Sequence, residues 1–163
     1  DSLDEENLEI LANTVITYSD LLTNRKTDYK FDLKKFTNVN GKTGIYIQYA
    51  LVRAKKLFLD SKVVKKDLKL NSLFLDTEDI DFLKCLIKFE IHFNQALTNS
   101  EPHHLADYLY DISNLFNKIY QSENILNNEN NEKKLNKLLI CYYFIEYSNL
   151  LMKLLGIRSV SKM

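Results

Sequence analysis

Residues 100–120 read SEPHHLADYLYDISNLFNKIY, and this stretch decides the class of fold. Pro102 stands where a helix can begin, because the first turn of a helix leaves backbone amides without partners and tolerates proline there. Apolar side chains then recur at intervals of three or four residues: Leu105, Tyr108, Leu109, Ile112, Leu115, Phe116 and Ile119. This periodicity predicts an amphipathic helix that places one face in a hydrophobic core.

Similar apolar stripes lie on both sides of this helix. Asp76 and Asp79 can cap a helix that reaches about Leu97, and a further helix is expected over residues 135–155. The asparagine-rich segment 127–131 before that last helix is typical of a solvated loop. Because short connections join these three helices, we expect them to be antiparallel neighbours around one core.

Two more helices are expected upstream. Residues 2–5, Ser-Leu-Asp-Glu, have the capping-box pattern and start an apolar stripe of several turns. Residues 44–60 form the next helix, and the irregular segment 23–43 between the two indicates a linker of extended or turn structure. The sequence therefore predicts an all-α bundle of about five helices. We expect residues 44–163 to form this bundle and residues 1–43 to join it to another part of a longer protein, because the chain begins without methionine at an acidic helix start.

The composition suits one helical domain with a locally charged surface. The chain has 163 residues, of which 45% are hydrophobic, and only three glycines and one proline. Lys plus Arg and Asp plus Glu are equal at 22 each, which excludes a strongly basic nucleic-acid-binding chain. Between residues 25 and 69, however, basic side chains outnumber acidic ones. Such a surface attracts phosphates without reading sequence, although a solvated lysine-rich face explains the same charges.

Neither the cysteines nor the histidines form a pattern typical of a metal or catalytic site. Cys85 and Cys141 lack CxxC spacing, and we interpret them as small core residues in a reduced compartment. His92, His103 and His104 lack HExxH or Cys/His spacing, so no metal and no catalytic base is expected. No apolar run approaches the roughly 18 residues that cross a bilayer, and no secretion signal is present. We therefore expect a cytoplasmic location and no membrane partner.

Aromatic and cationic residues gather in residues 44–53, GIYIQYALVR. Tyr49 and Arg53 stand four residues apart, so they share one face of a helix and can offer a ring beside a guanidinium. Unstacked RNA bases bind such pairs. The alternative is core packing, which is the more common role of aromatics at helical spacing and the one that we assign to Tyr108, Tyr142 and Tyr143.

A set of short motifs occurs in a fixed order along the chain. They are Asn24-Arg25, Tyr29, Phe31-Asp32, Gly41, Tyr46-Ile47-Gln48-Tyr49-Ala50, Arg53, Glu101-Pro102, Tyr108-Leu109-Tyr110-Asp111, Phe116, Tyr120 and Leu154-Leu155-Gly156-Ile157 to Met163. In this order and spacing the chain resembles arginyl-tRNA synthetases, nearly end to end. The resemblance is to their carboxy-terminal helical anticodon-binding domain, the DALR domain, preceded by the stretch that joins it to the catalytic core.

The resemblance also implies functional residues. The residues that match Tyr49, Arg53, Tyr120 and Met163 approach the anticodon loop in that family. We expect an anticodon-binding set of Tyr46, Gln48, Tyr49, Arg53, Tyr120, Asn124 and Met163, with Lys55 and Lys56 on a phosphate-contacting surface. The chain departs from the family at Leu51, where many relatives have histidine, at Asn124, where some have an aromatic residue, and at Ser159, where proline is common.

The resemblance implies a parent enzyme that joins arginine to its tRNA with ATP and Mg²⁺. The HIGH and KMSKS motifs of such enzymes do not occur here, so this chain is expected to bind RNA, to hold no cofactor and to catalyse nothing. The implied partners are tRNA(Arg) and the catalytic core of the parent, and DNA is not among them.

Two other interpretations remain open at this point. One is a protein-interaction module that docks through its acidic first helix. The other is the equivalent helical domain of the cysteine or glycine synthetase, although the Tyr-x-Gln-Tyr-Ala-x-x-Arg block favours arginine.

Overall fold

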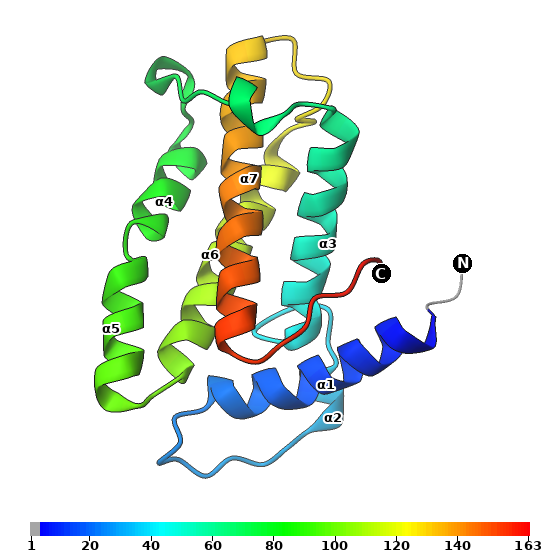
Figure 1. The fold of residues 1–163 in the computed structure, drawn as a ribbon, viewed down its shortest axis with the longest axis vertical. Helices are drawn as coiled ribbons and strands as arrows, with labels where there is room; N and C mark the ends of the chain where they lie inside the picture. Colours follow the sequence, from blue (N-terminus) through cyan, green and yellow to red (C-terminus); the bar gives the residue numbers. More distant parts are fainter. Residues whose placement is uncertain (1–3) are drawn as a thin grey trace.

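The chain folds into helices joined by loops, as Figure 1 shows for the computed structural model, which describes residues 4–163. The helices are α1 (Glu5–Leu22), α2 (Leu33–Phe36), α3 (Gly44–Ser61), α4 (Thr77–Leu86), α5 (Phe89–Asn99), α6 (His103–Ser122) and α7 (Asn131–Leu154), with 3-10 turns η1 (Lys65–Asp67) and η2 (Ser72–Phe74). Strands are absent from the part of the chain that is described. The predicted all-α bundle is therefore confirmed.

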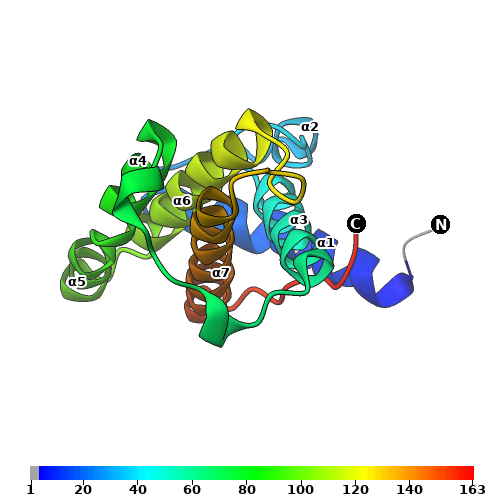
Figure 2. The same ribbon diagram turned by 90° about the horizontal axis from the view of Figure 1, so that it is seen from above.

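The bundle has α6 and α7 at its centre. Viewed from above, they stand between α3 on one side and α4 with α5 on the other (Figure 2). The rings of Phe116 on α6 and Phe144 on α7 are stacked, with centroids 4.3 Å apart. Cys141 is buried beside them in the same core, as predicted, and its thiol donates to the carbonyl of Ala54 on α3 at 3.3 Å. This core fixes α3 relative to α6, where the candidate site lies.

The first helix crosses one end of the bundle (Figure 1). Its amino terminus is capped by Asp4, whose carboxylate accepts from the amide of Asn7 at 2.8 Å, whereas Ser2 and Leu3 of the predicted capping box lie outside the described residues. Tyr18 is buried, and its hydroxyl donates to the Ala106 carbonyl on α6 at 2.9 Å. Helix α1 thus contributes to the bundle core.

A glycine allows α1 to approach α3 closely. A Cβ atom placed on Gly44 would lie 2.7 Å from Cγ2 of Thr14 and 2.8 Å from its carbonyl oxygen. Both distances are shorter than any ordinary contact, so a larger residue at position 44 would push the two helices apart.

The helix predicted to run from Asp76 to about Leu97 is interrupted. Helix α4 ends at Leu86 and α5 begins at Phe89, and the Leu86 carbonyl accepts a hydrogen bond from the buried Tyr108 hydroxyl at 3.0 Å. A carbonyl in the middle of a continuous helix would instead accept the amide four residues on. The tertiary bond therefore accompanies the break, and both short helices pack on α6.

The tyrosines assigned to the core do not all lie there. Tyr108 is buried and Tyr142 is half-buried, but Tyr143 is exposed, so its core assignment is wrong. Successive residues of a helix project about 100° apart, and Tyr143 therefore points away from the face that carries Phe144.

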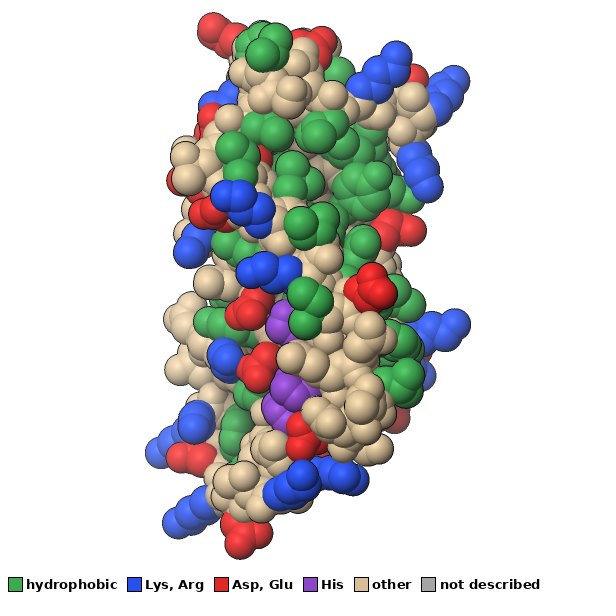
Figure 3. Space-filling view, turned by 90° about the vertical axis from the view of Figure 1, so that its left-hand side faces the viewer, with side chains coloured by type: hydrophobic (Ala, Val, Ile, Leu, Met, Phe, Trp, Pro, Cys, Tyr) green, Lys and Arg blue, Asp and Glu red, His purple; other side chains and the backbone are tan. Residues whose placement is uncertain are grey.

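Hydrophobic side chains also gather on the face formed by α4 and α5 (Figure 3). The histidines are visible on the same face (Figure 3). Ile87, between the two helices, and Ile91 and Leu97, on α5, are exposed. None of the helices in the described part of the chain combines the length and the hydrophobicity of a membrane span.

Candidate nucleic-acid interface

A cation held between two aromatic rings joins α3 to α6. The guanidinium carbon of Arg53 lies 4.3 Å from the ring centroid of Tyr49 and 4.6 Å from that of Tyr120. One guanidinium nitrogen of Arg53 donates to Asn117 Oδ1 at 3.2 Å. Tyr49 and Arg53 meet because they are one turn apart on α3, and Asn117 and Tyr120 are one turn apart on α6. We call Tyr49, Arg53 and Tyr120 the stack.

The stack lies at the surface. Tyr49 is 43% exposed, and Arg53 and Tyr120 are half-buried. The Tyr49 side chain is therefore within reach of a ligand, whereas the Arg53 guanidinium is oriented by its contacts with both rings and with Asn117. Each cation–π contact of this kind stabilises the arrangement by about 0.5–2 kcal/mol, depending on its exposure to water.

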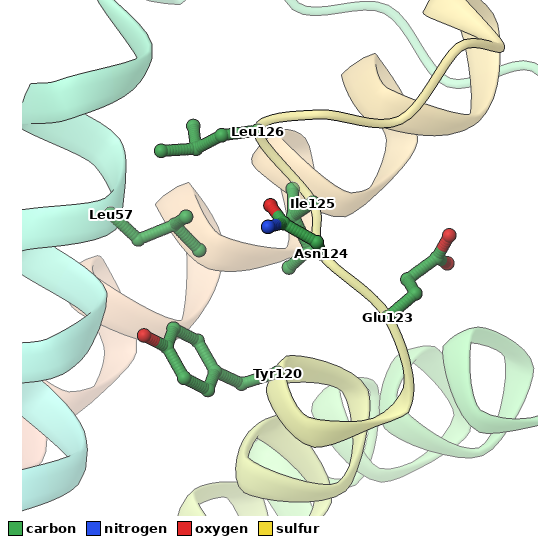
Figure 4. A pocket seen from close by; sticks show the side chains of 6 residues that line it. All are labelled: Leu57, Tyr120, Glu123, Asn124, Ile125 and Leu126. Carbon is green, nitrogen blue, oxygen red and sulfur yellow. The ribbon is translucent and has the colours of Figure 1, made fainter.

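A pocket opens beside the stack. It has a volume of about 360 Å³ and is lined by Leu57, Tyr120, Glu123, Asn124, Ile125 and Leu126. In Figure 4 the ring of Tyr120 points into the space between α3 and the loop after α6, with Leu57 entering from α3. Asn124, from the predicted binding set, lies on the loop side of this space, and its Oδ1 accepts the Asn127 amide at 3.3 Å. The pocket therefore combines an aromatic wall, aliphatic walls and an amide.

The loop that lines the pocket is anchored by charge. Glu123 receives Lys133 Nζ at 3.3 Å and Lys137 Nζ at 3.4 Å, and the Asn128 amide also donates to it. Figure 4 shows the Glu123 carboxylate pointing away from Leu57 and Tyr120. Glu123 therefore holds the loop against α7 rather than facing the pocket.

The same two lysines belong to a larger ion cluster. Lys137 lies 2.7 Å from Asp79 and 2.8 Å from Asp76, and the Lys137 and Asp79 side chains are both 0% exposed. Burial lowers the pKa of the Lys137 ammonium, but the hydrogen bonds that the ammonium donates to Asp76 and Asp79 outweigh burial and raise this pKa above its ordinary value. Lys137 therefore stays charged and ties the start of α4 to α7.

Tyr46 lies in a neighbouring aromatic group. Its ring centroid is 5.6 Å from that of Tyr110, and its hydroxyl donates to Asn114 Oδ1 at 3.5 Å. Lys42 Nζ lies 5.3 Å from the Tyr110 centroid and 2.7 Å from Asp107. Tyr46 is half-buried, so it is less accessible than Tyr49 although both lie on α3.

Gln48 does not lie at this surface. Its side chain is completely buried, and its amide nitrogen donates to Thr14 Oγ1 at 2.8 Å and to the Arg158 carbonyl at 2.7 Å. Its amide oxygen accepts from the Val160 backbone at 3.1 Å. Every polar group of Gln48 is thus used inside the protein, so the expectation that it contacts RNA is corrected.

The two lysines expected to contact phosphates differ. Lys55 Nζ donates to Ser159 Oγ at 3.1 Å, and burial lowers the pKa of the Lys55 ammonium. Lys56 is exposed. Met163, at the end of the segment that contains Ser159, is 40% exposed.

Two residues near the stack were missed in the sequence. Asn117 is buried and orients Arg53, and Leu57 forms a wall of the pocket. Spacing could have indicated both, because Asn117 stands one turn before Tyr120 and Leu57 one turn after Arg53.

Two of the three histidines, His103 and His104, lie at the start of α6. Ligand atoms of Glu101, His103 and His104 lie within 4.8 Å of one another. The Glu101 carboxylate already contacts Lys26 at 3.4 Å and His104 at 3.3 Å. This pairing explains the arrangement, and we assign no ion to it.

Comparison with known proteins identifies close similarity to one group. The family model of the DALR anticodon binding domain matches residues 47–163. The arginine–tRNA ligase of Francisella tularensis subsp. novicida is 34% identical over 170 aligned positions, which cover 100% of this chain and 29% of that protein. The arginine–tRNA ligase of Blochmanniella pennsylvanica is 35% identical over 155 positions, which cover 94% of this chain and 27% of that protein.

Solved structures show the same similarity. An arginyl-tRNA synthetase from Plasmodium falciparum superposes with a TM-score of 0.82 at 33% identity, over 95% of this chain and 27% of that one. The Thermus thermophilus arginyl-tRNA synthetase superposes with a TM-score of 0.90 over 100% of this chain and 28% of that one, and at 23% identity it supports the fold alone. The chain spans between 27% and 29% of the length of each of these four relatives.

Proposed function

Since this chain belongs to the DALR anticodon-binding domain family, we propose that it binds the anticodon loop of an arginine tRNA and holds unstacked bases at the stack and the adjoining pocket. The observation that carries this proposal is the Arg53 guanidinium, fixed 4.3 Å and 4.6 Å from two partly exposed tyrosine rings. Every base offers a flat face to such a surface, and one base–aromatic contact contributes about 1–3 kcal/mol.

The pocket supports the same proposal. Its volume of about 360 Å³ is sufficient for a base-sized ligand, and its walls include one aromatic face and aliphatic side chains. The Asn124 amide is the polar group that can pair with a base edge, since amides both donate and accept. We propose that a base pulled out of its stack enters between Leu57 and Tyr120.

Charge supports a nucleic-acid ligand rather than a neutral one. Arg53 carries five N–H donors, and Asn117 accepts from one of them. Lys56 is exposed on the same helix, so it can contact phosphate, whereas Lys55 is held by Ser159. We therefore expect binding that weakens as salt rises.

We further propose that the parent protein is an arginine–tRNA ligase that uses ATP and Mg²⁺ in the cytoplasm. Its catalytic core would lie outside the present chain, which spans 29% of the Francisella relative. This chain would then hold no cofactor and catalyse nothing. Its contribution would be positional, because a grip on the anticodon end presents the acceptor end to a distant active site. Residues 1–43 would connect the two parts.

A titration tests the RNA proposal. The chain is mixed with a labelled hairpin that carries the anticodon stem and loop of an arginine tRNA, and with the same hairpin after replacement of the anticodon bases, at two salt concentrations. We expect selective binding of the arginine hairpin, and weaker binding of both hairpins at high salt. Equal affinity for the two hairpins, or no binding at low salt, would overturn the proposal.

A further inference from the structure

Residues 157–163 after α7 form an extended segment that returns along α3 and α1 (Figure 1, red). We call this segment the tail. The turn into it is made by Gly156, whose positive φ of 71° is easy for glycine. Val160 is 0% exposed and packs in an apolar cluster with Ile10, Val52 and their neighbours. The tail is therefore anchored although it has no regular secondary structure.

Gln48 makes the main polar attachment of the tail. Its amide donates to the Arg158 carbonyl at 2.7 Å and accepts from the Val160 amide at 3.1 Å. The bonds join residues 110 and 112 positions apart in the sequence. Because the second N–H of the side chain donates to Thr14, Gln48 connects three elements at once.

Asn7 attaches the next part of the tail to α1. Its Oδ1 accepts from the Ser161 amide at 3.1 Å, and its Nδ2 donates to Ser161 Oγ at 3.2 Å. The carboxamides of Gln48 and Asn7 therefore accept from two consecutive backbone amides of the tail, those of Val160 and Ser161. Lys55 adds a bond to the hydroxyl of Ser159, which stands between Arg158 and Val160 in the tail.

The attachment lies next to the stack. Gln48 and Tyr49 are consecutive on α3 and project about 100° apart, so one side chain reaches the tail while the other faces solvent. Val52, in the cluster with Val160, likewise precedes Arg53. The tail thus borders the helix face that carries Tyr49 and Arg53.

We propose that Gln48 is a positioning residue that fixes the tail beside the stack and so holds Met163 where RNA binds. The proposal rests on the function proposed above for Tyr49 and Arg53. It replaces a direct RNA contact of Gln48 with an indirect one. The carboxamide of Gln48 supplies both the donor that the Arg158 carbonyl requires and the acceptor that the Val160 amide requires.

Gln48→Met tests the attachment without RNA. Methionine keeps most of the side-chain volume but leaves the Arg158 carbonyl and the Val160 amide without partners, so the tail should detach. Amide hydrogen exchange at Val160 should then become faster by a factor of about ten or more. Thr14→Val is the matched control, because it removes the α1 partner of Gln48 and leaves both tail bonds; exchange at Val160 should stay near that of the wild type.

A mutant cycle tests the effect on RNA. We expect Met163→Ala to weaken binding of the arginine hairpin about three- to tenfold in the wild type and to have no further effect in Gln48→Met, because contributions that act through one element are not additive. Asn7→Ala releases Ser161 only and should also reduce the effect of Met163→Ala on hairpin binding. This variant provides the test if Gln48→Met does not fold.

The two experiments separate the positioning role of Gln48 from the proposed RNA binding. Slow exchange at Val160 in Gln48→Met, or a full Met163→Ala effect in that background, would overturn the positioning role. If the wild-type chain does not bind the hairpin, the function proposed above fails, while the exchange result still reports on the attachment.

Discussion

Arg53 and Lys137 are both cations at the junction of helices, yet the protein surrounds them differently. Lys137 is 0% exposed, and its ammonium lies within 3.4 Å of three carboxylates. Arg53 is half-buried, contacts two aromatic faces and has one amide oxygen as its hydrogen-bond acceptor. The first cation is neutralised inside the fold, whereas the second keeps most of its donors for another molecule.

The difference shows how the surroundings of a charge separate structural from binding roles. A buried charge needs partners that match it, because desolvation costs more than one ion pair returns. Aromatic faces orient a guanidinium without using its N–H groups, since they contact the plane of the group and not its edge. We therefore expect mutations of Lys137 to affect stability and mutations of Arg53 to affect RNA binding.

The largest effect is expected from Lys137→Met. The substitution leaves Asp79 buried without its cation and should lower the free energy of unfolding by about 3–5 kcal/mol, measured by urea denaturation. Lys133→Met is the control, because Lys133 contacts Asp76 and Glu123 of the same cluster but is 30% exposed. It should cost about 1 kcal/mol or less. Equal losses in both variants would contradict the structural role of Lys137.

Arg53→Met should reduce RNA affinity more than it reduces stability, in contrast to Lys137→Met. It removes the charge and the planar group between the two rings, so hairpin affinity should fall about 10- to 100-fold, equal to about 1.4–2.7 kcal/mol. The free energy of unfolding should fall by about 1–2 kcal/mol, less than in Lys137→Met, because two cation–π contacts and the bond to Asn117 are lost but the side chain is half-buried. Arg53→Lys should restore only part of the affinity, since an ammonium lacks the planar fork. Affinity retained in Arg53→Met would remove this residue from the interface.

The ion cluster also predicts a dependence of stability on pH. Burial raises the pKa of the Asp76 carboxyl, but hydrogen bonds from Lys137 and Lys133 outweigh burial and hold it below its ordinary value of 3.8. A carboxyl with a lowered pKa contributes stability that is complete above the unfolded pKa and is lost as pH falls through the folded pKa. The urea midpoint should therefore decrease as pH falls below 3.8, and it should decrease less steeply in Asp76→Asn. If the urea midpoint fell equally steeply with pH in the wild type and in Asp76→Asn, Asp76 would be excluded as a source of the pH dependence.

The smallest effect is expected at the lysines of α3. Lys56→Ala should reduce the slope of log affinity against log salt by about one, because Lys56 is exposed and free to meet phosphate. Lys55→Ala should leave the slope nearly unchanged, since Lys55 donates to Ser159 and burial lowers its pKa. A larger change in the salt slope for Lys55→Ala than for Lys56→Ala would instead assign the phosphate contact to Lys55.

Local patterns predicted the parts of the molecule that depend on local geometry. The helices follow from apolar periodicity, and the contact of Tyr49 with Arg53 follows from their separation of four residues. The approach of Tyr120 came from the family resemblance, because residues 53 and 120 lie on different helices and no spacing rule relates them.

Long-range contacts explain what was not predicted. Gln48 is a polar residue of a type usually found at the surface. Its burial depends on a tail more than 100 positions away. The break after Leu86 accompanies a bond from Tyr108, and the charge of Lys137 is satisfied by residues of α4. The boundary at residue 43 stays a prediction, although α1 packs on α3 and α6.

The most direct test of the account is the affinity of the arginine hairpin for Tyr49→Ala, with Tyr49→Phe as the matched control and helical circular dichroism measured on both. Because Tyr49 is 43% exposed, its truncation should leave the helical signal intact. We predict that Tyr49→Ala loses about 1–3 kcal/mol of binding free energy and that Tyr49→Phe, which keeps the ring, loses much less. Wild-type affinity in Tyr49→Ala would contradict the claim that the stack receives RNA bases.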